Sequence, residues 1–141
     1  MNHGSATSAK LSAMRERLLP AIFLGGAAGG LARAALERAW PASGHGWPWV
    51  TFAANIAGTA LLASLMLLAQ RRPAALEYLG PLLGIGLCGA LTTFSTLQLE
   101  TVVLVHDGHA VLGVAYGLGS IGAGLLTAYG VIALAGGKPQ P

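Results

Sequence analysis

Four long apolar segments separated by short polar ones dominate the chain. They cover about residues 18–39, 50–69, 79–105 and 110–135. Each is long enough to cross a hydrocarbon core about 30 Å thick as an α-helix, which rises about 1.5 Å per residue. Open sheets and loops do not span a membrane, because their backbone polar groups would stay unpaired in lipid. The pattern therefore predicts an all-α integral membrane protein with four transmembrane helices in a single domain, 18–135.

The segments that flank and connect these spans are short. Residues 1–17 form a polar, basic N-terminal tail and residues 136–141 a C-terminal tail. A signal peptide would have a shorter apolar core and a small-residue cleavage site, so we expect the first apolar segment to be retained as a span. Between the first two spans, Trp40, Trp47 and Trp49 suit the membrane–water interface, where amphipathic rings are favoured.

The composition excludes most soluble functions. Of the 141 residues, 54% are hydrophobic and only 9% are charged, whereas a soluble domain carries about 25% charged residues. A net charge of +3 is too small to indicate a nucleic-acid-binding surface. The single cysteine excludes an intramolecular disulfide. The sequence shows no set of nucleophile, base and orienting group. We therefore expect no enzyme and no nucleic-acid partner.

The basic residues are unevenly distributed between the two sides of the predicted membrane domain. If the spans alternate in direction, the two tails and the 70–78 loop share one side. That side holds six basic residues and the other holds two, which predicts that both termini lie in the cytoplasm. The six are Lys10, Arg15, Arg17, Arg71, Arg72 and Lys138, and the two are Arg33 and Arg38.

Polar residues inside the spans are the candidate functional residues. Thr51, Asn55 and Thr59 lie four residues apart and therefore share one face of the second helix. An amide that faces lipid is costly, so Asn55 either bonds to a neighbouring helix or lines a polar pathway. The same alternatives, close packing or a polar track, apply to a face of the fourth span. That face comprises Gly113, Tyr116, Gly117, Ser120, Gly124 and Thr127.

Hydroxyl residues are concentrated in the middle of the third span. They are Thr92, Thr93, Ser95 and Thr96, and they follow Gly84, Gly86 and Gly89. Such residues compete with the backbone for hydrogen bonds, and glycines make an interruption easier. We predict a third helix broken at membrane depth, where freed carbonyls can bind a cation. The alternative is a continuous helix. The paired glycines of the first span, Gly25 with Gly29 and Gly26 with Gly30, indicate helix packing.

Residues 89–96, GALTTFST, followed by Glu100 resemble the third-helix signature of the CrcB/Fluc fluoride channels. Asn55 followed by Gly58 resembles the second-helix motif of that family, and the glycine-rich residues 25–30 resemble its first-helix motif. The resemblance covers nearly the whole chain. It implies a passive, fluoride-selective ion channel in the bacterial inner membrane, which exports cytoplasmic fluoride and gives fluoride resistance.

The resemblance also implies an antiparallel, dual-topology homodimer with two pores and a central structural Na⁺. The backbone carbonyls of Gly89 and Thr92 would hold the sodium ion. Asn55 would be a pore donor, and Phe94 would present the positive edge of its ring to fluoride. The implied pore residues are Asn55, Thr93, Phe94, Ser95, Thr96, Tyr116 and Ser120, with Arg33 and Glu100 as vestibule or structural residues.

Two features depart from the family pattern. Leu97 stands where the family has a second pore phenylalanine. The excess of basic residues on one side of the membrane domain is also unfavourable for insertion in both orientations. Both departures also fit one subunit of a heterodimer with an oppositely oriented paralogue, although we favour the homodimer. Other functional classes are a small proton-coupled exporter, which needs an ionisable group deep in the membrane, and a non-conducting subunit whose polar faces only join helices.

Overall fold

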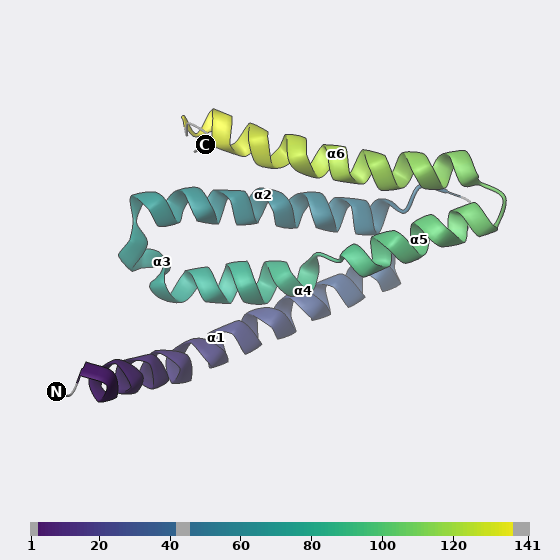
Figure 1. Cartoon of the computed structure of the whole chain (residues 1–141). Coiled ribbons are helices and arrows are strands. Elements are labelled where there is room, and N and C mark those ends of the chain that lie inside the picture. The colour runs from purple at the N-terminus through teal and green to yellow at the C-terminus, as the bar shows by residue number, and fades with distance from the viewer. Residues whose placement is uncertain (1–2, 42–45, 137–141) are drawn as a thin grey trace.

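The computed structural model describes residues 3–41 and 46–136, which are helical apart from short connections (Figure 1). The elements are α1 (His3–Ala39), α2 (Trp49–Arg71), α3 (Pro73–Leu79), the π-helical η1 (Gly80–Cys88), α4 (Gly89–Leu91), α5 (Phe94–His106) and α6 (Ala110–Leu134). Four segments are long and apolar enough to cross a membrane, namely Leu18–Ala39, Trp49–Arg71, Pro73–His106 and Ala110–Leu134. The prediction of an all-α chain with four such segments is confirmed.

Two boundaries differ from those expected from hydropathy. α1 already begins at His3, so most of the expected polar tail is helical. The third span begins at Pro73 rather than near residue 79, because the expected loop over 70–78 is reduced to a turn at Arg72. This residue has φ −140° and ψ 67°, outside the helical region. The N–H of the first helical residue has no partner within the helix, so proline, which lacks this N–H, is well suited to that position. Pro73 therefore starts the next helix directly after the turn.

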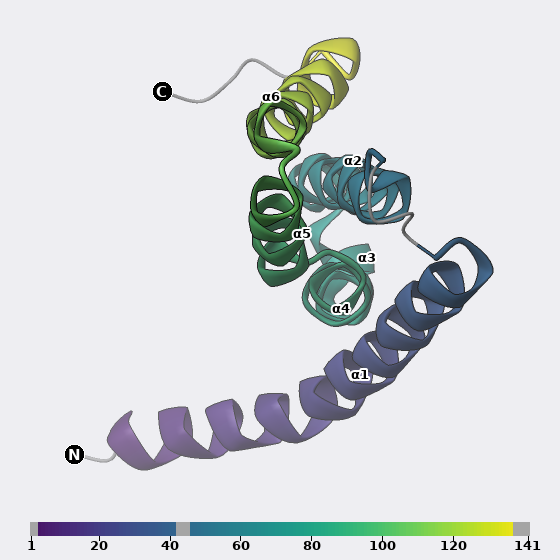
Figure 2. The same ribbon diagram turned by 90° about the vertical axis from the view of Figure 1, so that its right-hand side faces the viewer.

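The helices stack so that α2 lies between α6 and the η1–α4 half of the third span, and α1 crosses the outside of η1 (Figures 1 and 2). The start of α1, the α2–α3 turn and the end of α6 lie at one end of the structure (Figure 1). The start of α2 and the α5–α6 connection lie toward the other end (Figure 1). α2 and α6 run in the same direction, and the Arg71 guanidinium donates a hydrogen bond to the Ala135 carbonyl at the end of α6.

Glycines allow α1 to approach η1 at the backbone. A Cβ atom on Gly25 would overlap the carbonyl oxygen of Leu82, and one on Gly29 would likewise meet the backbone of η1. Small residues permit such close contact between membrane helices. The packing hypothesis is confirmed for these two glycines. A Cβ on Gly26 would have only an ordinary contact at 4.0 Å, and one on Gly30 would meet nothing within 4 Å.

A buried apolar cluster joins α5 to α6. Its centre consists of Leu97, Leu104 and Tyr116, with Trp47, Phe52 and Leu112 packed against it. Leu97, the residue at the position of the expected second phenylalanine, is only 6% exposed and therefore belongs to this cluster. The cluster fixes the α5–α6 pair and with it the position of Tyr116.

We expect the Gly25→Ala substitution to destabilise the protein, because the added methyl group would collide with the η1 backbone. Overpacking of this kind costs about 1–3 kcal/mol. The matched control is Gly26→Ala, which should leave the thermal unfolding midpoint unchanged or raise it, since alanine favours a helix over glycine by about 1 kcal/mol. Thermal unfolding of the detergent-purified variants measures both. A midpoint for Gly25→Ala as high as that of the control would contradict the close α1–η1 contact.

Candidate functional site

The third span loses its helical backbone at two residues between α4 and α5. Thr92 has φ −82° and ψ 149°, and Thr93 has φ −149° and ψ 122°, so both are extended. The helix resumes at Phe94, where the Thr93 hydroxyl oxygen caps α5 by accepting a hydrogen bond from the Thr96 N–H at 3.1 Å. A threonine at this position satisfies one of the N–H groups that a helix start leaves unpaired.

Asn55 of α2 bonds to both backbone groups of Thr93. The Thr93 N–H donates to Oδ1 at 2.8 Å, and Nδ2 donates to the Thr93 carbonyl at 3.1 Å. The amide therefore gives partners to both the N–H and the carbonyl of a residue with an extended backbone, as buried backbone groups require. This geometry supports the interhelical hydrogen bond, one of the two alternatives for Asn55. It does not exclude the other, because Nδ2 has a second hydrogen with no partner among the described residues.

The interruption also removes the helical donors of the Gly89 and Thr92 carbonyls. In a continuous helix the Gly89 carbonyl would accept from the N–H of Thr93, and the Thr92 carbonyl from the N–H of Thr96. The first N–H instead donates to Asn55, and the second donates to the Thr93 hydroxyl. A membrane-helix carbonyl freed from its helical donor is a suitable cation ligand. Carbonyl oxygens that lack a helical donor therefore occur at both residues expected to hold Na⁺, and the sodium site itself stays a prediction.

A cavity of about 290 Å³ lies beside the interruption, between α2 and the third span. Asn55, Thr93 and Phe94 contribute to its lining, and the Phe94 ring is 63% exposed. The absence of a side chain at Gly58 makes room for Thr92, whose methyl group a Cβ there would overlap. Polar groups and one aromatic ring are thereby collected at a single hollow.

A second polar cluster lies where α2, α5 and α6 meet. Glu100 accepts hydrogen bonds from the Thr51 hydroxyl to Oε1 at 2.7 Å and from the Tyr116 hydroxyl to Oε2 at 2.6 Å. Tyr116 is fully buried. The sequence placed Thr51 and Tyr116 on polar faces of their helices and gave Glu100 as a vestibule or structural residue, but it did not predict that the carboxylate joins the three helices. The usable signal was that a carboxylate in an apolar span needs donors, which hydroxyls from neighbouring spans can supply.

The remaining expected site residues are less closely connected. Ser95 and Thr96 interact with the Thr93 hydroxyl oxygen, at 3.1 and 3.0 Å between oxygens. Ser120 on α6 is buried, and its hydroxyl has no hydrogen-bond partner among the described residues. Arg33 on α1 forms an ion pair with Glu37, with 3.6 Å between Nε and Oε1, and has no bond to the interruption. The roles of all these residues in conduction stay predictions.

Comparison with known proteins identifies the family. The family model described as "CrcB-like protein, Camphor Resistance (CrcB)" matches residues 20–132. The chain is 45% identical over 113 residues to "Fluoride-specific ion channel FluC 1" of Mycobacterium bovis, covering 80% of this chain and 86% of that protein. It is 39% identical over 129 residues to the protein of the same name from Cutibacterium acnes, covering 84% and 85%. The chain therefore belongs to the CrcB family.

Proposed function

We propose that this chain forms a passive, fluoride-selective ion channel in the bacterial inner membrane, which exports cytoplasmic fluoride and gives fluoride resistance. The observation that carries the proposal is the polar interruption at Thr92 and Thr93, held by Asn55 and bordered by Phe94. It occurs in a chain 45% identical to relatives named as fluoride-specific ion channels. In acidic surroundings HF enters a cell and dissociates there. A fluoride leak then releases the anion without ATP or a catalytic cycle.

The chemistry of fluoride makes these side chains suitable. Fluoride is small and holds its water strongly, so a selective pore must supply replacement hydrogen-bond donors. The second N–H of Asn55 and the buried, unpartnered hydroxyl of Ser120 can donate. The exposed ring of Phe94 can turn its positive edge toward an anion while excluding bulk water. These groups carry no formal charge. They can therefore replace the water around fluoride without binding the ion so tightly that it is trapped.

The assembly we propose is an antiparallel homodimer with two pores and a central structural Na⁺. The freed carbonyls of Gly89 and Thr92 are the ligands that each protomer would contribute, and a two-fold axis would double the set. When bound, the ion would supply positive charge that offsets the repulsion between two anion paths. The excess of basic residues at one end favours a second candidate, a heterodimer with an oppositely oriented paralogue.

Fluoride release from liposomes tests the channel. Liposomes containing the purified protein should release fluoride and retain chloride. Asn55→Leu removes both the donor and the bonds to Thr93, and we expect fluoride release to fall by at least about tenfold. Ser64→Ala is the matched control, because Ser64 is an exposed α2 residue whose hydroxyl only bonds back to Ala60. Equal release of fluoride and chloride, or wild-type release from a folded Asn55→Leu protein, would overturn the proposal.

The aromatic edge at the cavity is tested by Phe94→Leu. Leucine keeps the apolar bulk and removes the positive ring edge, so we expect a slower fluoride release with unchanged protein stability. Phe23→Leu serves as the control, because Phe23 is an exposed phenylalanine of α1 that does not line the cavity. A stopped-flow or electrode assay on the same liposomes gives both rates. If the two variants conduct alike, the ring at position 94 has no part in permeation.

The proposed sodium site predicts a cation-dependent stability. The dimer should unfold at a higher temperature in NaCl than in N-methylglucamine chloride of equal ionic strength, because a ligand that binds only the folded state stabilises it. Size-exclusion chromatography in the two salts reports the dimer itself. Copurification of a differently tagged second copy of this chain is expected for the homodimer. A protein that stays monomeric until a paralogue is coexpressed would instead establish the heterodimer.

A further inference from the structure

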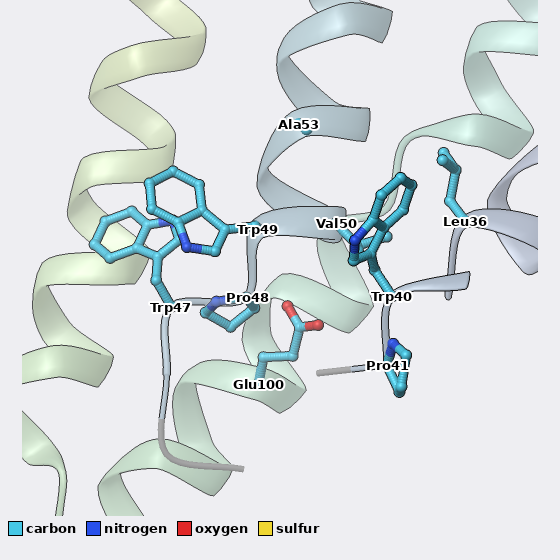
Figure 3. A pocket seen from close by; sticks show the side chains of 9 residues that line it. All are labelled: Leu36, Trp40, Pro41, Trp47, Pro48, Trp49, Val50, Ala53 and Glu100. Carbon is cyan, nitrogen blue, oxygen red and sulfur yellow. The ribbon is translucent and has the colours of Figure 1, made fainter. Parts of the chain in front are cut away.

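A second cavity, of about 560 Å³, lies between the end of α1 and the start of α2. Its walls include Trp40, Trp47 and Trp49, which are all three tryptophans of the chain. Glu100 also contributes to the lining. In the view of Figure 3 its carboxylate lies between the Trp47–Pro48 side and the Trp40–Pro41 side of the cavity. The cavity therefore combines aromatic walls with one acidic group.

The aromatic wall is held in place by ring contacts. The Trp47 ring meets Tyr116 edge-on, with centroids 5.3 Å apart and an interplanar angle of 85°. It meets Phe52 in a similar way at 5.6 Å, whereas its contact with Trp49, at 5.8 Å, is tilted by 38°. The edge-to-face pairs fix the orientation of the Trp47 ring. This side of the wall is therefore already ordered and loses little conformational entropy when a ligand binds.

The carboxylate in this cavity has donors but no cation. Its hydrogen bonds come from the uncharged hydroxyls of Thr51 and Tyr116, one to each oxygen. In the described part of the chain, the ion pairs are Arg33 with Glu37 and His106 with Asp107, and neither includes Glu100. The two hydroxyls orient the carboxylate without neutralising it. A cation entering the cavity would therefore meet an oriented acidic group that forms no ion pair with a basic side chain of the described residues.

We propose that this cavity binds a small organic cation with an alkylammonium head, either quaternary or primary. Aromatic faces attract such cations through the ring quadrupole, and several faces around one ammonium group form the known recognition arrangement. The volume lies within the range of small-molecule sites. Tryptophans favour the membrane interface, so the cavity is expected to lie where both lipid head groups and dissolved cations can reach it. An ammonium head group of a lipid and a free alkylammonium ion present the same chemistry to the site. The proposal does not depend on whether fluoride passes through the protein.

The test is a titration of the full-length protein in detergent with choline chloride, with NaCl keeping the ionic strength constant. Every tryptophan lines the cavity, so intrinsic fluorescence reports on it directly, and calorimetry gives an independent affinity. The neutral isostere 3,3-dimethylbutan-1-ol separates charge from shape. We expect saturable choline binding and a response to the alcohol weaker by at least about tenfold. A response that does not saturate, or equal affinities for the two compounds, would overturn the proposal.

Two variants locate the site. Glu100→Gln should weaken choline binding by at least about tenfold, whereas Glu37→Gln, which removes an exposed carboxylate outside the cavity, should not. Trp40→Leu removes one wall without changing the bonds of Glu100, so it remains informative if Glu100→Gln fails to fold. We expect it too to weaken choline binding. Wild-type affinity in a folded Glu100→Gln or Trp40→Leu protein would refute the assigned cavity.

The lipid composition distinguishes the two sources of the cation. In nanodiscs of phosphatidylcholine the lipid head groups compete for the site, whereas head groups of phosphatidylglycerol offer no ammonium. Choline affinity that is lower in phosphatidylcholine than in phosphatidylglycerol supports a lipid occupant. Equal, saturable affinity in both supports a free alkylammonium ligand.

Discussion

The pairing of the Asn55 amide with the backbone N–H and carbonyl of Thr93 is the contact on which the candidate site depends. A peptide group outside a helix has no water to bond with in hydrocarbon, so an interruption there persists only if the protein supplies both a donor and an acceptor. One carboxamide supplies both, at 3.1 and 2.8 Å. The same bond withholds the Thr93 N–H from Gly89. The interruption and its free carbonyl therefore have a single cause.

α2 connects the two polar clusters of the structure. Asn55 bonds to the interruption, and Thr51, one turn earlier on the same face, bonds to Glu100 of α5. The carboxylate in turn accepts from Tyr116 of α6. Packing and polar lining, which the sequence left as alternatives for this face, are compatible at Asn55, which both bonds to the third span and lines the smaller cavity. Thr51 joins two helices without lining either cavity, whereas its partner Glu100 lines the larger one. A displacement of α2 would disturb both clusters together.

The sequence was sufficient for the spans because long apolar segments have few alternatives to a helix in lipid. It was insufficient at the α2–α3 turn, where residues 73–78 have too little apolar character to extend a span by hydropathy, although Pro73 is a helix-starting residue. Composition singled out the hydroxyl-rich segment, in which Thr92 and Thr93 have extended dihedrals, and a break at membrane depth stays a prediction. The partners of Glu100 could not be predicted, since they depend on the relative rotation of three helices.

The shared direction of α2 and α6 has an electrical consequence. Each helix carries a partial negative charge at its carboxyl end, and both of these ends lie beside Arg71, whose guanidinium bonds to the last turn of α6 (Figure 1). The basic side chain therefore meets two parallel dipoles, and part of its charge is balanced locally. A second copy inserted upside down would present the same dipoles to the opposite face of the membrane. The pair would then present these two helix ends, and the arginine beside them, equally at both faces of the membrane.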